Sequence, residues 1–194
     1  MFDTLSYIGD KLNKANILWG VGASILLNQF GMVDTPNDID IFMDIKDIHK
    51  ADKILKKLGK KREYEETSTY STKYFYEYVV NGIDIDVMAG FAINHDNGVY
   101  NYIFDNMSIS EYKLINGVSI PFTSLEDWYV IYQLIPNREI KVEMIEKYLL
   151  TNGVKKDNLL RRSLDCNLPS IVKCKINNIL TPKTIYTIKR VDIF

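Results

Sequence analysis

The sequence has no excess of charge of either sign. Among its 194 residues, 24 Lys and Arg side chains stand against 25 Asp and Glu side chains, a formal net charge of −1. Proteins that bind DNA or RNA normally show a basic excess or a basic stripe. The charge balance therefore argues against nucleic acid as a partner and favours a small substrate.

Cysteine is scarce, and long apolar runs are missing. Cys166 and Cys174 match no zinc-binding spacing, and one pair of cysteines does not make a disulfide framework. No run of about 18 apolar residues occurs that could cross a membrane, and the first residues lack the basic and apolar regions of a signal peptide. We therefore expect a cytoplasmic protein without a membrane span, whose two thiols are free.

What the sequence does contain is an alternation of helical and strand patterns. In the first 122 residues the predicted helices lie at about 3–14, from Gly22 to Gly31, and at 48–58. The predicted strands lie at 17–20, 38–43, 74–80 and 83–88, and a second hairpin spans 112–121. This order predicts an α/β (α+β) fold, in which helices flank a mixed β-sheet.

Beyond residue 122 the pattern is helical. Ser124 is suited to cap a helix that stops before Pro136. A further helix is predicted over 138–150, with Ile140, Met144, Ile145 and Tyr148 facing inward. Weaker helical patterns follow around Leu159–Leu164 and Ile171–Ile179. We therefore expect two parts, residues 1–122 and a helical region of residues 123–194 packed on them.

Two copies of one acidic tripeptide lie in predicted strands, Asp38-Ile39-Asp40 and Asp84-Ile85-Asp86. Side chains alternate faces along a strand, so the two aspartates of each copy share a face. Like charges on a half-buried surface repel each other unless a cation compensates them. Carboxylate pairs that hold two divalent ions are the machinery of phosphoryl and nucleotidyl transfer. A plain alternative is that these charges guard a strand edge against aggregation.

A glycine-bearing turn precedes the first acidic copy. The segment Trp19-Gly20-Val21-Gly22-Ala23-Ser24 reads as a strand, a turn and the start of a helix. Backbone N–H groups at a helix N-terminus bind phosphate, and glycines allow a close approach. Gly20, Gly22 and Ser24 are therefore candidates to bind a triphosphate, although Ser24 suits an ordinary position early in a helix equally well.

The order of these segments resembles the polymerase-β-type nucleotidyltransferase superfamily. The likeness covers about residues 15–150 and rests on Trp19–Ser24, on Asn37–Ile41 and on the later Ile85-Asp86-Val87. The chain is most similar to small bacterial lincosamide and aminoglycoside nucleotidyltransferases and to the nucleotidyltransferases of toxin–antitoxin systems. The resemblance implies that Asp38, Asp40 and Asp86 are the metal ligands and catalytic carboxylates, with Asp84 as the substitute for Asp86.

The resemblance further implies two Mg²⁺ ions, with Mn²⁺ as an alternative, and a nucleoside triphosphate as co-substrate. The implied reaction transfers a nucleoside monophosphate to a hydroxyl acceptor, which is a small molecule such as an antibiotic, or a protein or RNA hydroxyl. A catalytically silent member that binds a nucleotide or a partner protein is the alternative, since the segment Val33–Asn37 departs from the family pattern. The sequence leaves the acceptor, the base preference and the oligomeric state open.

Four cations beyond residue 122 are candidates to contact the triphosphate or the acceptor, although plain solvation is their ordinary role. They are Arg138, Lys141, Arg161 and Arg162. The aromatic residues between Tyr70 and Tyr78 suit packing in strands, with stacking on a nucleobase as a second reading.

Overall fold

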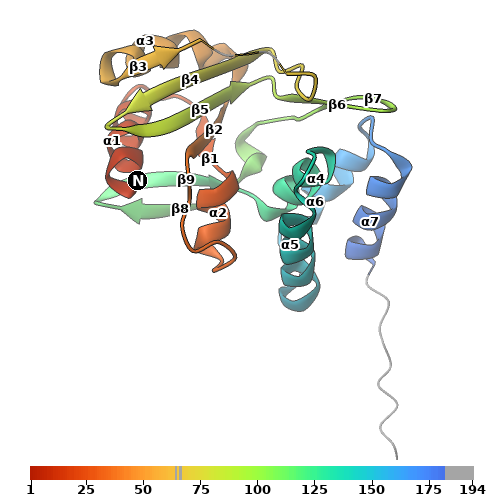
Figure 1. Cartoon of the computed structure of the whole chain (residues 1–194). Helices are drawn as coiled ribbons and strands as arrows, with labels where there is room; N and C mark the ends of the chain where they lie inside the picture. Colours follow the sequence, from red (N-terminus) through yellow and green to blue (C-terminus); the bar gives the residue numbers. More distant parts are fainter. Residues whose placement is uncertain (64, 66, 182–194) are drawn as a thin grey trace, which may run out of the picture.

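A computed structural model describes residues 1–63, 65 and 67–181 of the chain. Its centre is a mixed seven-stranded sheet in the order β3-β4-β5-β2-β1-β9-β8 (Figure 1). The seven strands are β1 (Trp19–Val21), β2 (Ile39–Met43), β3 (Lys60–Arg62), β4 (Tyr74–Val80), β5 (Ile83–Ala89), β8 (Ile109–Ile115) and β9 (Val118–Thr123). A separate hairpin consists of β6 (Ala92–His95) and β7 (Gly98–Asn101). The predicted mixed sheet flanked by helices is confirmed.

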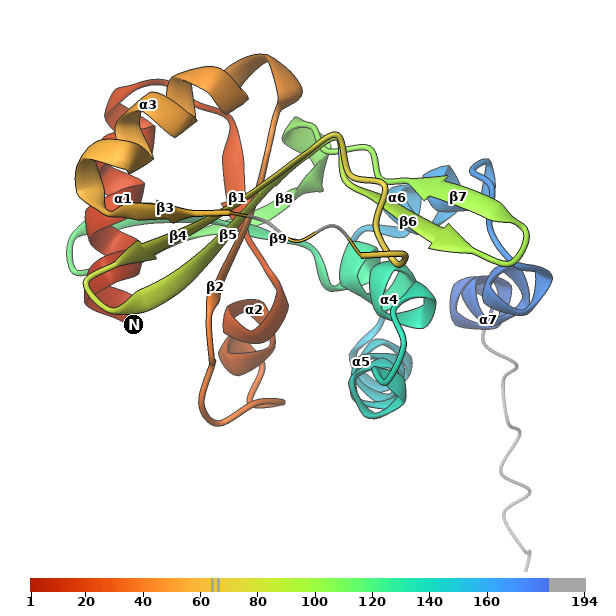
Figure 2. The same cartoon turned by 45° about the horizontal axis from the view of Figure 1, so that its top comes forward.

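Seven α-helices surround the strands in the described part of the chain. They are α1 (Phe2–Lys14), α2 (Ala23–Gln29), α3 (Ile48–Leu58), α4 (Leu125–Leu134), α5 (Glu139–Asn152), α6 (Asp157–Leu164) and α7 (Ser170–Leu180). Helices α1 and α3 lie on one side of the sheet and α2 on the other, while α4 to α7 gather at one end of it (Figure 2). Among the described residues, no helix is both long and apolar enough to span a bilayer.

Local sequence signals place the elements of the sheet that carry the acidic residues. Asn81 and Gly82 both have positive φ, at 52° and 76°, which is the conformation that a two-residue hairpin turn requires. They join β4 to β5 with Glu77 opposite Asp86. Because β5 then runs parallel to β2, the Asp-Ile-Asp segments of the two strands lie side by side.

Buried polar contacts of α4 hold the helical region together. Ser124 caps this helix by accepting the N–H of Asp127, as predicted. Glu126 is buried and its carboxylate accepts the backbone N–H groups of Lys155 and Lys156, each at 2.9 Å. The division at residue 122/123 stays a prediction, and residues 182–194 of the predicted helical region lie outside the described residues.

Several details of the sequence-based prediction are wrong in instructive ways. Strand β3 was not predicted, because Lys60-Lys61-Arg62 carries no apolar pattern, and the hairpin of β6 and β7 was not predicted either. Ile140 and Met144 do not face inward on α5, since they are 70% and 38% exposed. Ile145 is buried as predicted, and Val142 and Leu149 complete the buried face of α5.

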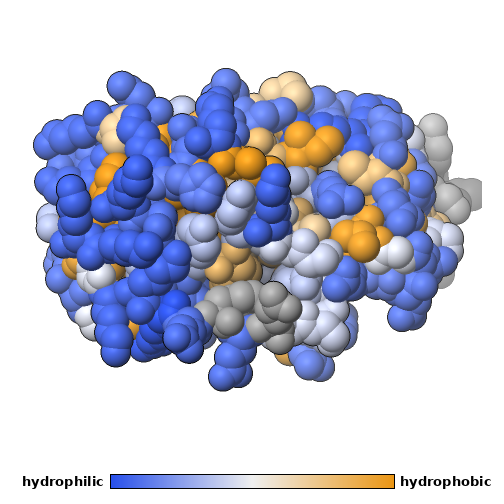
Figure 3. All heavy atoms as spheres, turned by 90° about the horizontal axis from the view of Figure 1, so that it is seen from above, coloured by the Kyte–Doolittle hydropathy of each residue, from blue (hydrophilic) through white to orange (hydrophobic). Residues whose placement is uncertain are grey.

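Helix α3 buries a narrow apolar face and exposes a lysine-rich one. Ile48, Ala51 and Leu55 are buried, whereas most other residues of the helix are polar and solvent-facing. Hydrophilic side chains cover most of the surface seen from above, the side on which α3 lies (Figure 3). Asp52 accepts hydrogen bonds from Lys56, Lys61 and the Tyr78 hydroxyl, which ties α3 to the strands beneath it.

Trp128 of α4 packs directly against the glycine turn between β1 and α2. Its indole N–H donates to Thr123 Oγ1 at 2.8 Å, and the Thr123 hydroxyl donates to the carbonyl oxygen of Val21 at 3.0 Å. A methyl group added at Gly22 would overlap the indole ring. The absence of a side chain at Gly22 therefore allows α4 to lie against the end of β1.

Substituting Gly22→Ala is expected to lower the free energy of unfolding by about 1–3 kcal/mol, because the added methyl group displaces a packed ring. Denaturant unfolding measures this loss. In a Trp128→Phe background, where the ring is smaller, the same substitution is expected to cost less. Equal costs in the two backgrounds would show that the Trp128 ring is not the reason for glycine at this position.

Candidate active site

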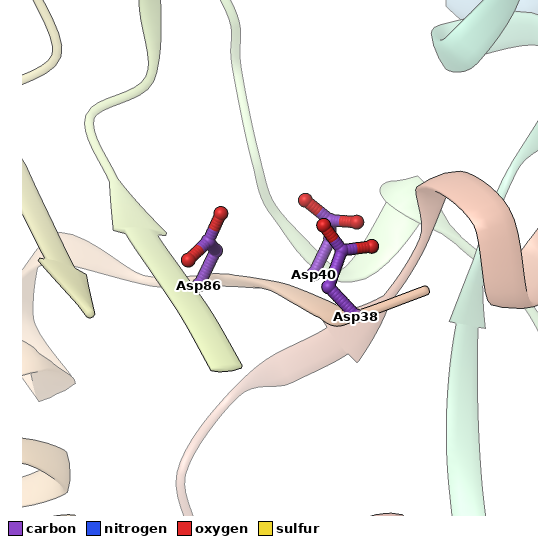
Figure 4. Close-up of side chains that lie close together, drawn as sticks. All are labelled: Asp38, Asp40 and Asp86. Carbon is purple, nitrogen blue, oxygen red and sulfur yellow. The ribbon is translucent and has the colours of Figure 1, made fainter. Parts of the chain in front are cut away.

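Three aspartates from two neighbouring strands come together on one side of the sheet. Asp40 of β2 and Asp86 of β5 are opposite each other in the parallel register, and Asp38 directly precedes β2. One carboxylate oxygen from each lies within 4.8 Å of the other two. All three side chains extend from the same side of the two strands (Figure 4). The convergence expected from the sequence is thus present in the structure.

The three carboxylates raise the cost of ionisation for one another. Burial, followed by the charges of Asp38 and Asp86, holds the pKa of Asp40 well above its ordinary range. Burial, with Asp38 as the next contributor, raises the pKa of Asp86 to about 7. In the absence of a bound cation the cluster therefore retains protons near neutral pH. Such a site gains from any positive charge that enters it.

Asp84 lies apart from this cluster, although it shares a strand with Asp86. It is exposed and pairs with Arg62, whose Nη1 lies 2.9 Å from Asp84 Oδ1. The two-residue spacing places Asp84 on the same face of β5 but further from Asp38 and Asp40. The structure therefore brings Asp86, and not Asp84, to the pair on β2.

The glycine turn lies beside the acidic cluster. The N–H of Gly22 donates to the carbonyl oxygen of Asp40 at 3.0 Å, and Ser24 Oγ donates to Asp38 Oδ1 at 3.4 Å. Ala23 has a φ of +45°, a left-handed conformation that costs a residue with a side chain roughly 1–2 kcal/mol. Ser24 and Ala23 face the cluster, whereas Gly20 lies within β1 beneath Ile109 and Thr123.

A cavity of about 230 Å³ opens above the aspartates. Its floor is acidic, and its far wall comes from the start of the helical region, where α4 ends and α5 begins. The lining residues are Ala23, Ser24, Asn37, Asp38, Asp40, Tyr70, Phe75, Asp86, Met88, Phe91, Trp128, Tyr132, Ile135, Arg138 and Lys141. Gly20 and Gly22 are not among them, so their role in binding phosphate stays a prediction.

Of the four cations singled out in the sequence, two reach this cavity. Arg138 and Lys141 lie in its wall, and burial together with the neighbouring charge of Arg138 lowers the pKa of Lys141. The other two are engaged elsewhere. Arg161 pairs with Asp157, and Arg162 pairs with Asp105. The cavity thus combines an acidic floor with a basic wall.

Trp128 and Tyr132 are not among the site residues predicted from the sequence, yet both are buried core residues that also line the cavity. The Tyr132 hydroxyl is buried and has no hydrogen-bond partner among the described residues, and burial, followed by the charge of Asp40, raises its pKa. The sequence contains a signal for this, because the segment Leu125–Leu134 has no continuous polar face. In the structure nearly every residue of the segment is buried. A helix of this kind contacts other elements on all sides.

No protein-family model matches the chain, and no curated protein does. Solved structures do match. A Thermotoga maritima protein assigned as a nucleotidyltransferase, TM1012, has a TM-score of 0.55 at 23% identity, over 75% of this chain and 89% of that one. The structure of ANT(2")-Ia in complex with adenylyl-2"-tobramycin has a TM-score of 0.52 at 14% identity, over 92% and 94%. The lincomycin-bound lincosamide antibiotic adenylyltransferase LnuA has a TM-score of 0.51 at 18% identity, over 74% and 95%.

The chain has the polymerase-β-type nucleotidyltransferase fold. Within this fold, the Asp38, Asp40 and Asp86 oxygens form a group that could hold a metal ion. The donors fit a hard divalent cation, since Mg²⁺ prefers carboxylate oxygens. The raised pKa values of Asp40 and Asp86 are what a cation-binding cluster shows before a cation enters.

The raised pKa of Asp86 predicts a pH-dependent effect of Asp86→Asn on stability. In the folded protein this carboxyl group keeps its proton up to about pH 7, whereas in the unfolded chain it loses it near its ordinary value of 3.8. Between these values the folded state binds more protons at this site, so rising pH lowers the stability of the wild type. Asparagine does not titrate, so its stabilising effect should grow over this range.

Thermal unfolding of both proteins in a chelator, at about pH 5 and about pH 8, measures the effect. The melting temperature of the variant minus that of the wild type is expected to be larger at the higher pH. The same difference at both pH values would mean that Asp86 is ionised throughout.

Proposed function

We propose that this protein is a Mg²⁺-dependent nucleotidyltransferase, which transfers a nucleoside monophosphate from a nucleoside triphosphate to a hydroxyl acceptor. The acceptor oxygen forms a bond to the α-phosphorus, the bond to the bridging oxygen breaks, and pyrophosphate leaves. One observation carries the proposal: Asp38, Asp40 and Asp86 converge on the floor of a cavity whose opposite wall presents Arg138 and Lys141.

Asp38, Asp40 and Asp86 would hold the divalent ions. When bound, such ions lower the pKa of an attacking oxygen and neutralise the charge of a leaving group. The sheet fixes the carboxylates because Asp40 and Asp86 belong to paired strands. The hydrogen bond from Ser24 restrains Asp38, which lies just outside β2.

Asp86 is suited to accept the proton of the acceptor hydroxyl. It stands across from Asp40 of β2 and from Asp38, which precedes that strand, so it can complete the cation site and still reach a hydroxyl that enters the cavity. Asp38 and Asp40 are adjacent on the other strand and suit the shared binding of cations.

Arg138 and Lys141 are placed to bind the phosphates that do not react. A triphosphate carries several negative charges, which an acidic floor alone would repel. Cations on the facing wall attract it and stabilise the pyrophosphate as it leaves. Structural similarity to two antibiotic adenylyltransferases supports a small molecule as the acceptor, and so does the modest size of the cavity, about 230 Å³.

Asp40→Asn is expected to lower the rate of nucleotidyl transfer more than about a hundredfold. Replacing a residue that only hydrogen-bonds to a metal ligand already lowers metal affinity or activity about 10- to 100-fold, and Asp40 is placed to be a ligand itself. The assay incubates the enzyme and Mg²⁺ with each of the four nucleoside triphosphates and a panel of hydroxyl compounds, and measures pyrophosphate. Asp84→Asn is the matched control, since Asp84 lies on β5 outside the cluster.

Full activity of Asp40→Asn, or equal losses in both variants, would contradict the assigned roles. Binding of a triphosphate by the wild type without release of pyrophosphate against any acceptor would instead support a silent nucleotide-binding protein.

Lys141→Gln is expected to lower kcat/KM for the triphosphate about 10- to 100-fold, which corresponds to the loss of one charge-assisted hydrogen bond to phosphate. Lys147→Gln is a suitable control, because Lys147 is an exposed residue of the same helix. Steady-state kinetics with varied triphosphate concentration gives kcat/KM for each of the two variants. An unchanged value for Lys141→Gln would remove this residue from the phosphate site.

A further inference from the structure

The two edges of the seven-stranded sheet differ in how they are protected. The edge strand β3 consists of Lys60, Lys61 and Arg62, and charged edge strands resist pairing with another chain. The opposite edge strand, β8, presents two large apolar side chains to solvent. Tyr112 is 65% exposed and Leu114 is 78% exposed. The part of β8 that carries these two side chains can serve as a template for strand pairing.

The backbone groups at the outer edge of β8 can be assigned from its pairing with β9. Asn116 and Gly117 form a two-residue turn with φ of 50° and 78°, so the flanking Ile115 and Val118 form a hydrogen-bonded pair. Such pairs alternate with pairs that are not hydrogen-bonded. The backbone N–H and C=O groups of Tyr112 and Leu114 therefore point away from β9. Pro121, opposite Tyr112, agrees with this because it has no N–H to donate.

No strand of the described chain pairs with this outer edge (Figure 1). Seven consecutive residues, Ile109–Ile115, form β8, which is long for a strand with one side open. The strand begins with an irregularity between Ile109 and Glu111, so its regular part runs from Glu111 to Ile115. Tyr112 and Leu114 both lie in that regular part.

The sequence of β8 is complementary to itself in the antiparallel direction. If two copies pair about a twofold axis at Tyr112, each Tyr112 faces its counterpart. Glu111 then faces Lys113 of the partner subunit, and Lys113 faces Glu111 of the partner subunit. Opposite charges directly across a strand pair stabilise it. The same operation on β3 places cation against cation, which disfavours pairing there.

We propose that two copies of this chain associate through their β8 strands, antiparallel and centred on Tyr112. The contact joins the two sheets into one and covers Tyr112 and Leu114 of both copies. It is a closed twofold contact, since the same strand serves both partners and no unpaired β8 remains. None of Glu111, Tyr112, Lys113 and Leu114 lines the acidic cavity, so the association leaves both cavities open.

Cysteine cross-linking tests the register. A hydrogen-bonded antiparallel pair has its Cα atoms about 5.5 Å apart, which a disulfide can bridge. In a full-length chain with Cys166→Ser and Cys174→Ser, Tyr112→Cys is therefore expected to give a covalent dimer on mild oxidation. Leu114→Cys is the matched control, because its two copies would lie four residues apart, about 13 Å. Cross-linking of neither variant, or equal cross-linking of both, would overturn the proposal.

Charge reversal tests the pairing without a cross-link. Glu111→Lys and Lys113→Glu each place like charges across the axis, so each variant alone is expected to be monomeric in sedimentation at concentrations where the wild type is dimeric. A mixture of the two variants restores opposite charges and is expected to form a heterodimer. Formation of the heterodimer also shows that both variants are folded.

Two results would overturn the proposal. One is a monomeric wild type at the highest concentration tested. The other is a dimer that both single reversals leave intact. Melting curves of each variant complete the control, because within its own chain Lys113 pairs with Glu111 at 3.3 Å and also contacts Gln29.

Discussion

The mutual repulsion of three carboxylates, held in place by one strand register, is the constraint on which the site depends. Asp40 and Asp86 are opposite each other because β2 and β5 are parallel and hydrogen-bonded, so neither side chain can retreat from the other. A flexible loop would let the charges separate. The sheet keeps the carboxylates together, and burial, followed by their mutual repulsion, raises the pKa values of Asp40 and Asp86.

The wall opposite this cluster is built by a helix that has no free surface. Because α4 is buried on all sides, it links the sheet, through Trp128, to the loop before α6, through Glu126. Its last turn carries Tyr132, and the following loop leads to Arg138 and Lys141. The position of the basic wall relative to the acidic floor is therefore set by core packing.

Much of this arrangement could be predicted from local patterns. The alternation in Asp38-Ile39-Asp40, the Asn81-Gly82 turn and the Ser124 cap are each encoded in a few adjacent residues. The choice of Asp86 over Asp84 was only favoured, because it depends on the register between strands distant in sequence. The sequence likewise did not distinguish the cations that reach the cavity from those that do not. Arg138 and Arg161 both lie in predicted helical segments, and only tertiary packing places one of them at the cavity. Strand β3 was missed because its pairing with β4, rather than any apolar pattern, makes it a strand.

The parallel pairing of β2 with β5 has a consequence for how the protein folds. Its two strands are separated in the chain by α3, β3 and β4, so the carboxylates meet only after a long loop has closed. Until then the three carboxylates lie apart and do not repel one another. A cation site formed by them would therefore be a property of the completed sheet, and a cation bound there would add to the stability of the native state alone.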